Sequence, residues 1–153
     1  MRIDEKTREE FYRWATRHMR ENTPSQILGK GDDIYLKRWY IRRNAEEWPN
    51  NLYIHLMLRS DADPECHDHP FDNVSVVLDG GYNEEDRTGA MKAVMPGDII
   101  IRSAETAHRI VLTNGPSISL FLTGPKRREW GFWRGDEWIH SHRFFEQREQ
   151  KFA

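Results

Sequence analysis

Residues 66–80 of this chain read Cys-His-Asp-His-Pro-Phe-Asp-Asn-Val-Ser-Val-Val-Leu-Asp-Gly, and this stretch carries the strongest indication of the fold. His67 and His69 are two residues apart, so in an extended strand both imidazoles lie on the same face. That spacing suits shared coordination of one metal ion. Cys66 falls on the opposite face, where packing is favoured over ligation by its thiolate.

A third ligand must come from elsewhere in the sheet. Pro96-Gly97-Asp98 marks a turn, and Ile99-Ile100-Ile101 is long enough for a strand, so His108 can return beside the first pair. Three neutral imidazoles suit Fe, Ni, Cu, Zn and some Mn sites and leave open positions for water or substrate. We therefore predict one divalent metal bound by His67, His69 and His108.

Both halves of this pattern resemble the motifs of the cupin superfamily. The first family motif runs His-x-His, three or four residues, Glu, six residues and Gly, and it is similar to His67-Asp68-His69 followed by Asn73 and Gly80. The second is a Pro-Gly-Asp turn with a His about eleven residues after the Gly, which His108 matches. The resemblance implies a double-stranded β-barrel together with a metal site.

The chain departs from the family pattern at the fourth ligand. Asn73 stands where the family usually has Glu, and Asp72 precedes it. An amide binds metal weakly, whereas a bulge that turned Asp72 inward would supply a charge. We expect three His ligands with Asn73 or Asp72 beside the metal. Cupins that resemble thiol dioxygenases also lack the Glu, which favours Fe(II), with Zn, Ni or Mn as alternatives.

Short segments with alternating apolar and polar residues surround these motifs and predict strands. They cover residues 33–42, 52–59, 74–78, 90–94, 99–102, 108–112 and 117–123. No helical pattern separates them, so an antiparallel sandwich or barrel is favoured over a parallel α/β sheet. We predict a mainly β, jelly-roll-like cupin barrel over about residues 33–140, within a single domain of 153 residues.

An amphipathic helix is predicted before the barrel, over about residues 8–21. Thr7 and Glu10 have the spacing of a capping box, and Phe11, Trp14 and Met19 fall on one helical face with Ala15 and His18. We expect this face to pack against the outside of the barrel. The polar tail, about residues 143–153, is predicted to be a short helix or a frayed end.

Charge and composition limit the kinds of partner that the chain can have. The chain has 23 basic and 25 acidic residues, which gives no cationic excess for binding nucleic acid. Cys66 is the only cysteine, and no segment approaches the roughly 20 apolar residues of a membrane span or the apolar run of a signal peptide. We expect a cytoplasmic protein that acts on a small molecule and has no nucleic-acid or membrane partner; a homodimer stays open.

The strand predicted at residues 52–59 has one aliphatic face, while its other face carries Tyr53, His55, Met57 and Arg59. An aliphatic lumen and a lumen lined by the mixed face are both compatible with the pattern. In the second case Arg59 would bind a carboxylate in bidentate fashion, while Tyr53 and His55 would donate hydrogen bonds to the substrate. These three are the candidate catalytic residues.

Several functions fit these residues. The leading hypothesis is a dioxygenase-like, mononuclear non-haem iron enzyme acting on a small anionic molecule. A non-redox isomerase or lyase and a non-enzymatic ligand-binding cupin are the alternatives, because a fold does not fix a function.

Two further features carry weaker signals. The late aromatic block of Trp130, Trp133 and Trp138 favours packing over a stacking platform, and His140 and His142 lack a matching third ligand.

Overall fold

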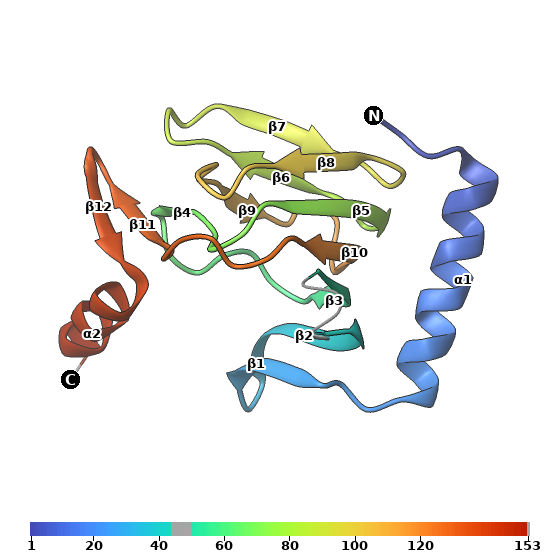
Figure 1. Cartoon of the computed structure of the whole chain (residues 1–153). Helices are drawn as coiled ribbons and strands as arrows, with labels where there is room; N and C mark the ends of the chain where they lie inside the picture. Colours follow the sequence, from blue (N-terminus) through green and yellow to red (C-terminus); the bar gives the residue numbers. More distant parts are fainter. Residues whose placement is uncertain (44–49, 153) are drawn as a thin grey trace.

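The structure is a computed structural model that describes residues 1–43 and 50–152. Residues 44–49, inside the predicted barrel, and Ala153, at the end of the predicted tail, lie outside the described residues. The elements of the described part are shown in Figure 1 and are α1 (Glu5–Glu21), β1 (Gln26–Lys30), β2 (Asp33–Arg42), β3 (Asn51–Met57), β4 (Cys66–His67), β5 (Asn73–Asp79), β6 (Tyr82–Glu85), β7 (Met91–Val94), β8 (Ile99–Arg102), β9 (Arg109–Val111), β10 (Ser117–Thr123), β11 (Gly131–Arg134), β12 (Glu137–His140) and α2 (Ser141–Phe152).

The strands form three antiparallel sheets. One has six strands in the order β1-β2-β3-β10-β5-β8, and two have three strands each, β12-β11-β4 and β7-β6-β9. The two small sheets meet where His67 and His108 exchange backbone hydrogen bonds, each 2.9 Å from nitrogen to oxygen. They therefore form one wall of a barrel whose other wall is the six-stranded sheet, and the predicted mainly β architecture is confirmed.

The side-chain alternation of β3 separates two environments. Its aliphatic residues Leu52, Ile54 and Leu56 contribute to the core beneath α1. Its other face points into the barrel, where His55 and Met57 line a cavity. The mixed face therefore occupies the lumen, which decides between the two orientations that the sequence leaves open.

The glycine of the first motif sits at a tight approach between two strands. Gly80 has a φ of 79°, in the left-handed region. A Cβ at this position would lie 2.1 Å from the carbonyl oxygen of Pro116. Only glycine satisfies both conditions.

Helix α1 begins earlier than the sequence analysis predicts. Its N-cap is Asp4, whose carboxylate accepts hydrogen bonds from the backbone N–H of Thr7 at 2.9 Å and from the Thr7 hydroxyl at 2.8 Å. Asp4 satisfies one of the free N–H groups of the first turn, so Thr7 is not the cap and the helix starts at Glu5.

The buried face of α1 also differs from the predicted one. Ala15 is fully buried, and Tyr12 and Met19 pack with it against the outside of the six-stranded sheet. Phe11 and Trp14 stay 39% and 42% exposed. Successive residues of a helix are rotated by roughly 100°, so a stripe displaced by one residue keeps Ala15 and Met19 but excludes the other two.

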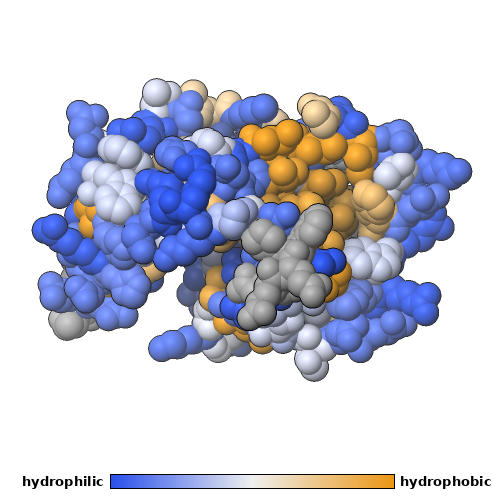
Figure 2. Space-filling model, in the orientation of Figure 1, coloured by the Kyte–Doolittle hydropathy of each residue, from blue (hydrophilic) through white to orange (hydrophobic). Residues whose placement is uncertain are grey.

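One apolar row of the six-stranded sheet remains outside the cover of α1. Ile101 is 67% exposed and Leu122 is 39% exposed. Figure 2 shows apolar residues gathered on this face of the molecule. The cross-strand register of β8, β5 and β10 aligns Ile101 and Leu122 on either side of Val74.

The predicted tail is helix α2, which packs on the sheet β12-β11-β4 (Figure 1). Phe144 is 2% exposed, and its ring stacks on that of Phe132 with centroids 3.8 Å apart. Ile139 completes this small core.

No helix among the described residues is long and apolar enough to cross a membrane.

Candidate metal centre

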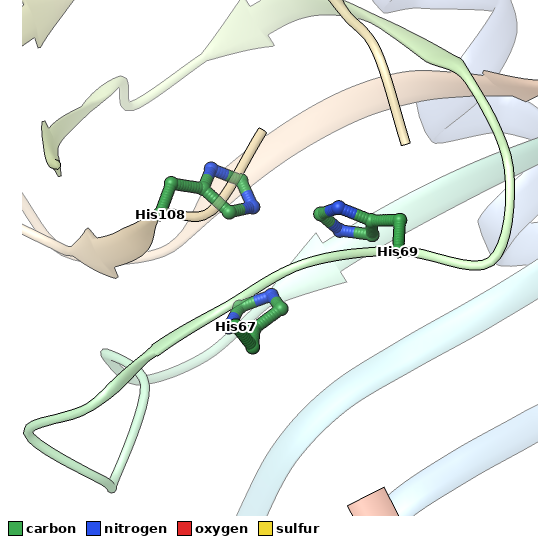
Figure 3. A group of neighbouring side chains, drawn as sticks. All are labelled: His67, His69 and His108. Carbon is green, nitrogen blue, oxygen red and sulfur yellow. The ribbon is translucent and has the colours of Figure 1, made fainter. Parts of the chain in front are cut away.

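Three histidines converge inside the barrel, as Figure 3 shows. His67 lies on β4, His69 follows it after one residue, and His108 directly precedes β9. Their ring centroids are 4.9, 5.0 and 5.1 Å apart, and their candidate ligand nitrogens all lie within 4.8 Å of one another. No other group of His, Cys, Asp or Glu side chains meets this description among the described residues. The structure thus brings the three predicted ligands together.

The chemistry of these rings fits a divalent metal. Nδ1 of His69 and Nε2 of His108 are buried, and neither has a hydrogen-bond partner among the described residues. Burial lowers the pKa of His67 to about 4 and lowers the pKa of His69 well below 6.5, so both rings are neutral and carry a lone pair. Unpartnered buried nitrogens cost free energy that coordination of an ion would recover.

Glu84 on β6 orients the third ring. Its Oε1 lies 2.5 Å from Nδ1 of His108, and Arg102 binds both of its oxygens at 2.6 and 2.8 Å. Burial alone would raise the pKa of Glu84, but the hydrogen bonds from Arg102 and His108 hold it well below its usual value. An ionised Glu84 can only accept, so Nδ1 of His108 donates and Nε2 is left for a ligand.

Asp61 is a second carboxylate near the histidines. Its Oδ2 lies 3.8 Å from Nδ1 of His67 and accepts a hydrogen bond from the backbone N–H of Ile110 at 2.7 Å. The hydroxyl of Tyr35 donates to its other oxygen. Asp61 is therefore fixed beside His67, although beyond hydrogen-bond distance of the ring.

The structure does not bring Asp72 to the histidines. Asp72 is exposed, and its Oδ1 accepts hydrogen bonds from Arg127 at 2.8 Å and from the backbone N–H of Ala104 at 2.8 Å. No bulge turns it inward, because β5 begins at Asn73 and alternates as expected over its first five residues. Asn73 is 2% exposed, and its Oδ1 accepts a hydrogen bond from Arg102 at 3.3 Å.

Asp68, between the two histidines, is a residue that the sequence analysis misses. It is 1% exposed, and its carboxylate is directed toward β11 and β12. Its carboxylate accepts hydrogen bonds from the backbone N–H of Gly131 at 2.8 Å and from the indoles of Trp138 at 2.9 Å and Trp133 at 3.3 Å. Arg128 adds an ion pair at 3.0 Å. Asp68 therefore ties the histidine segment to the hairpin of β11 and β12.

A cavity of about 510 Å³ extends from the histidines to the six-stranded sheet. Two rungs of that sheet line it. A rung here is a row of residues paired across β1, β2, β3 and β10. They are Gln26, Arg38, His55 and Ser119 in the first rung and Leu28, Leu36, Met57 and Ser117 in the second. A second hollow of about 370 Å³ shares His67, Trp130 and Phe145 with the cavity. Trp130 thus belongs to the wall of the site.

The three candidate catalytic residues lie in three different places. His55 lines the cavity, and Tyr53 is buried behind it, with the two rings stacked at 5.9 Å. Arg59 does not follow them into the lumen. Strand β3 ends at Met57, so the alternation stops, and Arg59 lines the adjoining hollow in an ion pair with Asp33 at 2.8 Å.

Two weaker candidates lie outside this centre. Cys66 is buried with its Sγ 3.6 Å from the carbonyl oxygen of Glu85, and burial raises the pKa of its thiol to about 11. His140 contacts Glu129, with 3.2 Å between Nε2 and Oε2. Neither joins the group formed by His67, His69 and His108.

Solved structures of low sequence identity share this fold. A conserved protein with a double-stranded β-helix domain from Klebsiella pneumoniae aligns with a TM-score of 0.53 and 14% identity, covering 71% of this chain and 90% of that one. The DMSP lyase DddQ from Ruegeria pomeroyi aligns with 0.55 and 14%, covering 75% and 59%. Fe(II) HppE aligns with 0.53 and 15%, covering 64% and 55%. No protein family model and no curated protein matches the chain.

Proposed function

Because the chain has the double-stranded β-helix fold of the cupins, we propose that it is a metal-dependent enzyme acting on a small molecule. The observation that carries this proposal is the convergence of three histidines at one cavity, with two of their nitrogens buried and unpartnered. His67, His69 and His108 would hold one divalent ion. Such a donor set leaves coordination positions open toward the cavity.

Fe(II) is the metal we favour, with Zn, Ni and Mn as the other candidates. The candidate ligand group among the described residues contains no carboxylate. Glu84 lies behind His108, Asp72 lies at the surface, and Asp61 stays 3.8 Å from Nδ1 of His67. This neutral set is similar to that of cupins that keep three His and lack the Glu. Fe(II) HppE, which shares the fold, supports iron chemistry as one use of such a barrel.

The bound metal would supply activation of O2 or polarisation of a substrate oxygen. The chain's own residues prepare the site around it. Glu84 holds the proton of His108 on Nδ1, and the apolar side chains of Trp130, Phe145 and Leu28 keep water away from the approach to the histidines. His55, which is neutral because burial lowers its pKa, offers a fixed polar group on the opposite wall.

A non-redox reaction is the second candidate. The DMSP lyase DddQ shares the fold, and three imidazoles also suit zinc and nickel, which would act only as Lewis acids. A cupin that binds a ligand without turnover is the third. The identity of the bound metal distinguishes the first two candidate functions, and turnover of a substrate distinguishes both from the third.

The decisive experiment is metal analysis of freshly purified protein, followed by anaerobic addition of nitric oxide. We expect about one metal per chain, and for Fe(II) with open positions a nitrosyl EPR signal. His108→Ala should lose most of the metal, while His140→Ala should keep it. Full metal content in His108→Ala together with loss in His140→Ala would move the site to the β12–α2 corner.

A further inference from the structure

Arg38 on β2 lines the cavity, and the proposed metal chemistry gives it no role. Its Nε donates a hydrogen bond to Nε2 of His55 at 2.9 Å, and its Nη1 donates to Oε1 of Gln26 at 3.0 Å. Both partners lie on the same rung of the sheet as Arg38. They fix the guanidinium in place without supplying a negative charge.

Other arginines around the cavity and the adjoining hollow are paired with carboxylates. Arg102 pairs with Glu84 at 2.6 Å, and Arg148 pairs with Asp63 at 2.7 Å. Arg59 pairs with Asp33 at 2.8 Å. Within residues 1–43 and 50–152, Arg38 has no carboxylate partner, and its contacts are with His55, Gln26 and the ring of Tyr53.

The neighbours of Arg38 leave its charge uncompensated. Burial lowers the pKa of Arg38 below 12.5, although a guanidinium stays protonated at ordinary pH. Burial and the nearby Arg38 also lower the pKa of His55 well below 6.5, so His55 is neutral and accepts the hydrogen bond. A partly buried cation without a counter-charge costs free energy that a bound anion would offset.

The surface beside Arg38 suits the flat body of an organic molecule. The ring of His55 stacks on Phe121 with centroids 4.7 Å apart, and on Tyr53 with centroids 5.9 Å apart. His55 and Phe121 line the same cavity as Arg38 and the three histidines. Only two of the guanidinium nitrogens are engaged, so N–H donors on Nη1 and Nη2 remain for a bidentate ligand.

We propose that Arg38 is the anion-binding residue of the substrate site and that the substrate is a small organic molecule carrying an oxyanion group, a carboxylate or a phosphate. The oxyanion binds Arg38, and the body of the molecule lies along His55 and Phe121 with its reactive end at the three histidines. The reaction rests on the proposed function, but the anion site itself needs no metal. The two proposals can therefore fail separately.

The test is calorimetric titration of metal-free and metal-loaded protein with three probes. Benzoate carries a carboxylate on a flat ring, benzamide is its neutral counterpart, and inorganic phosphate distinguishes the second oxyanion. We expect benzoate to bind metal-free wild type about tenfold or more tightly than benzamide. Tighter binding of phosphate than of benzoate would assign the site to phosphorylated substrates.

Three variants locate the anion. Arg38→Met should weaken benzoate binding by about a hundredfold, and Arg38→Lys, which keeps the charge but lacks the planar fork, by about tenfold. Arg17→Met removes an exposed cation of α1 and should bind benzoate as wild type does. Arg38→Lys also serves if Arg38→Met does not fold, because it preserves the buried stem and the charge.

Two results would overturn the inference. Equal affinities of wild type and Arg38→Lys for benzoate, with no preference over benzamide, would remove Arg38 from the site. Benzoate binding only to metal-loaded protein, unaffected in both Arg38 variants, would place the anion on the metal instead. If wild-type protein takes up no metal but still binds benzoate through Arg38, the proposed metal function is refuted and this inference stands.

Discussion

Oε1 of Glu84 lies 2.5 Å from Nδ1 of His108, so the carboxylate on β6 determines which nitrogen of that ring is available to a metal. Arg102 holds the carboxylate from the other side through both of its oxygens. The histidine is therefore oriented by a chain of contacts that starts at the buried guanidinium. Substitution of such an outer partner typically lowers metal affinity, although the partner does not touch the ion.

Glu84→Gln should lower metal affinity by about 10- to 100-fold, because an amide no longer enforces the Nδ1–H tautomer of His108. Chelator competition measures this change. Glu85→Gln is the matched control, since Glu85 follows on the same strand and pairs with Arg109 at 3.1 Å instead. Equal metal affinities in the two variants would show that Glu84 does not position His108.

Asp72→Ala should leave metal affinity unchanged, because Asp72 is engaged by Arg127 at the surface. Asn73→Ala should weaken metal binding modestly, by about two- to fivefold, since it removes one hydrogen bond from Arg102, which holds Glu84. The same chelator competition gives both values. A large loss in Asp72→Ala alone would require a carboxylate ligand after all.

Asp68→Asn should lower the free energy of unfolding by about 2–4 kcal/mol, because several donors converge on this buried carboxylate and an amide opposes some of them with its own N–H groups. Denaturant unfolding of metal-free protein measures the difference. Asp72→Asn provides the comparison: it alters an exposed ion pair and should leave the free energy of unfolding nearly unchanged. Similar losses in both variants would mean that Asp68 does not anchor the histidine segment.

Tyr12→Ala should destabilise the protein by about 1.5–3 kcal/mol, because Tyr12 packs with Ala15 on the sheet. Trp14→Ala should cost less than about 1 kcal/mol, since Trp14 is 42% exposed. Thermal unfolding with and without metal gives both numbers, and metal content should not change in either variant. A larger loss for Trp14→Ala would show that its ring is covered in solution.

The sequence predicts most of the centre because its decisive signals are local. The two-residue spacing of His67 and His69 fixes their common face, and the same alternation predicts that Asn73 points inward. The turn at Pro96-Gly97-Asp98 correctly predicts that His108 returns to them. Short strands with clear alternation likewise predict a barrel.

The remaining contacts join residues far apart in the chain, and no local pattern reveals them. Glu84 and His108 are 24 residues apart, and Asp68 reaches the indole of Trp138 over 70 residues. Arg38 reads in the sequence as one charged residue of an alternating strand, and only the register with His55 shows its position in the cavity. Arg59 continues the same alternation in the sequence, but strand β3 ends two residues before it.

The reciprocal hydrogen bonds between His67 and His108 place two metal ligands at the seam that joins the small sheets. An ion bound there is therefore linked thermodynamically to closure of the barrel. If it binds only the closed form, a hundredfold excess over its dissociation constant adds about 2.7 kcal/mol to the stability of that form. The backbone amides of these two histidines should then exchange with deuterium more slowly in loaded protein, so their protection factors report occupancy directly.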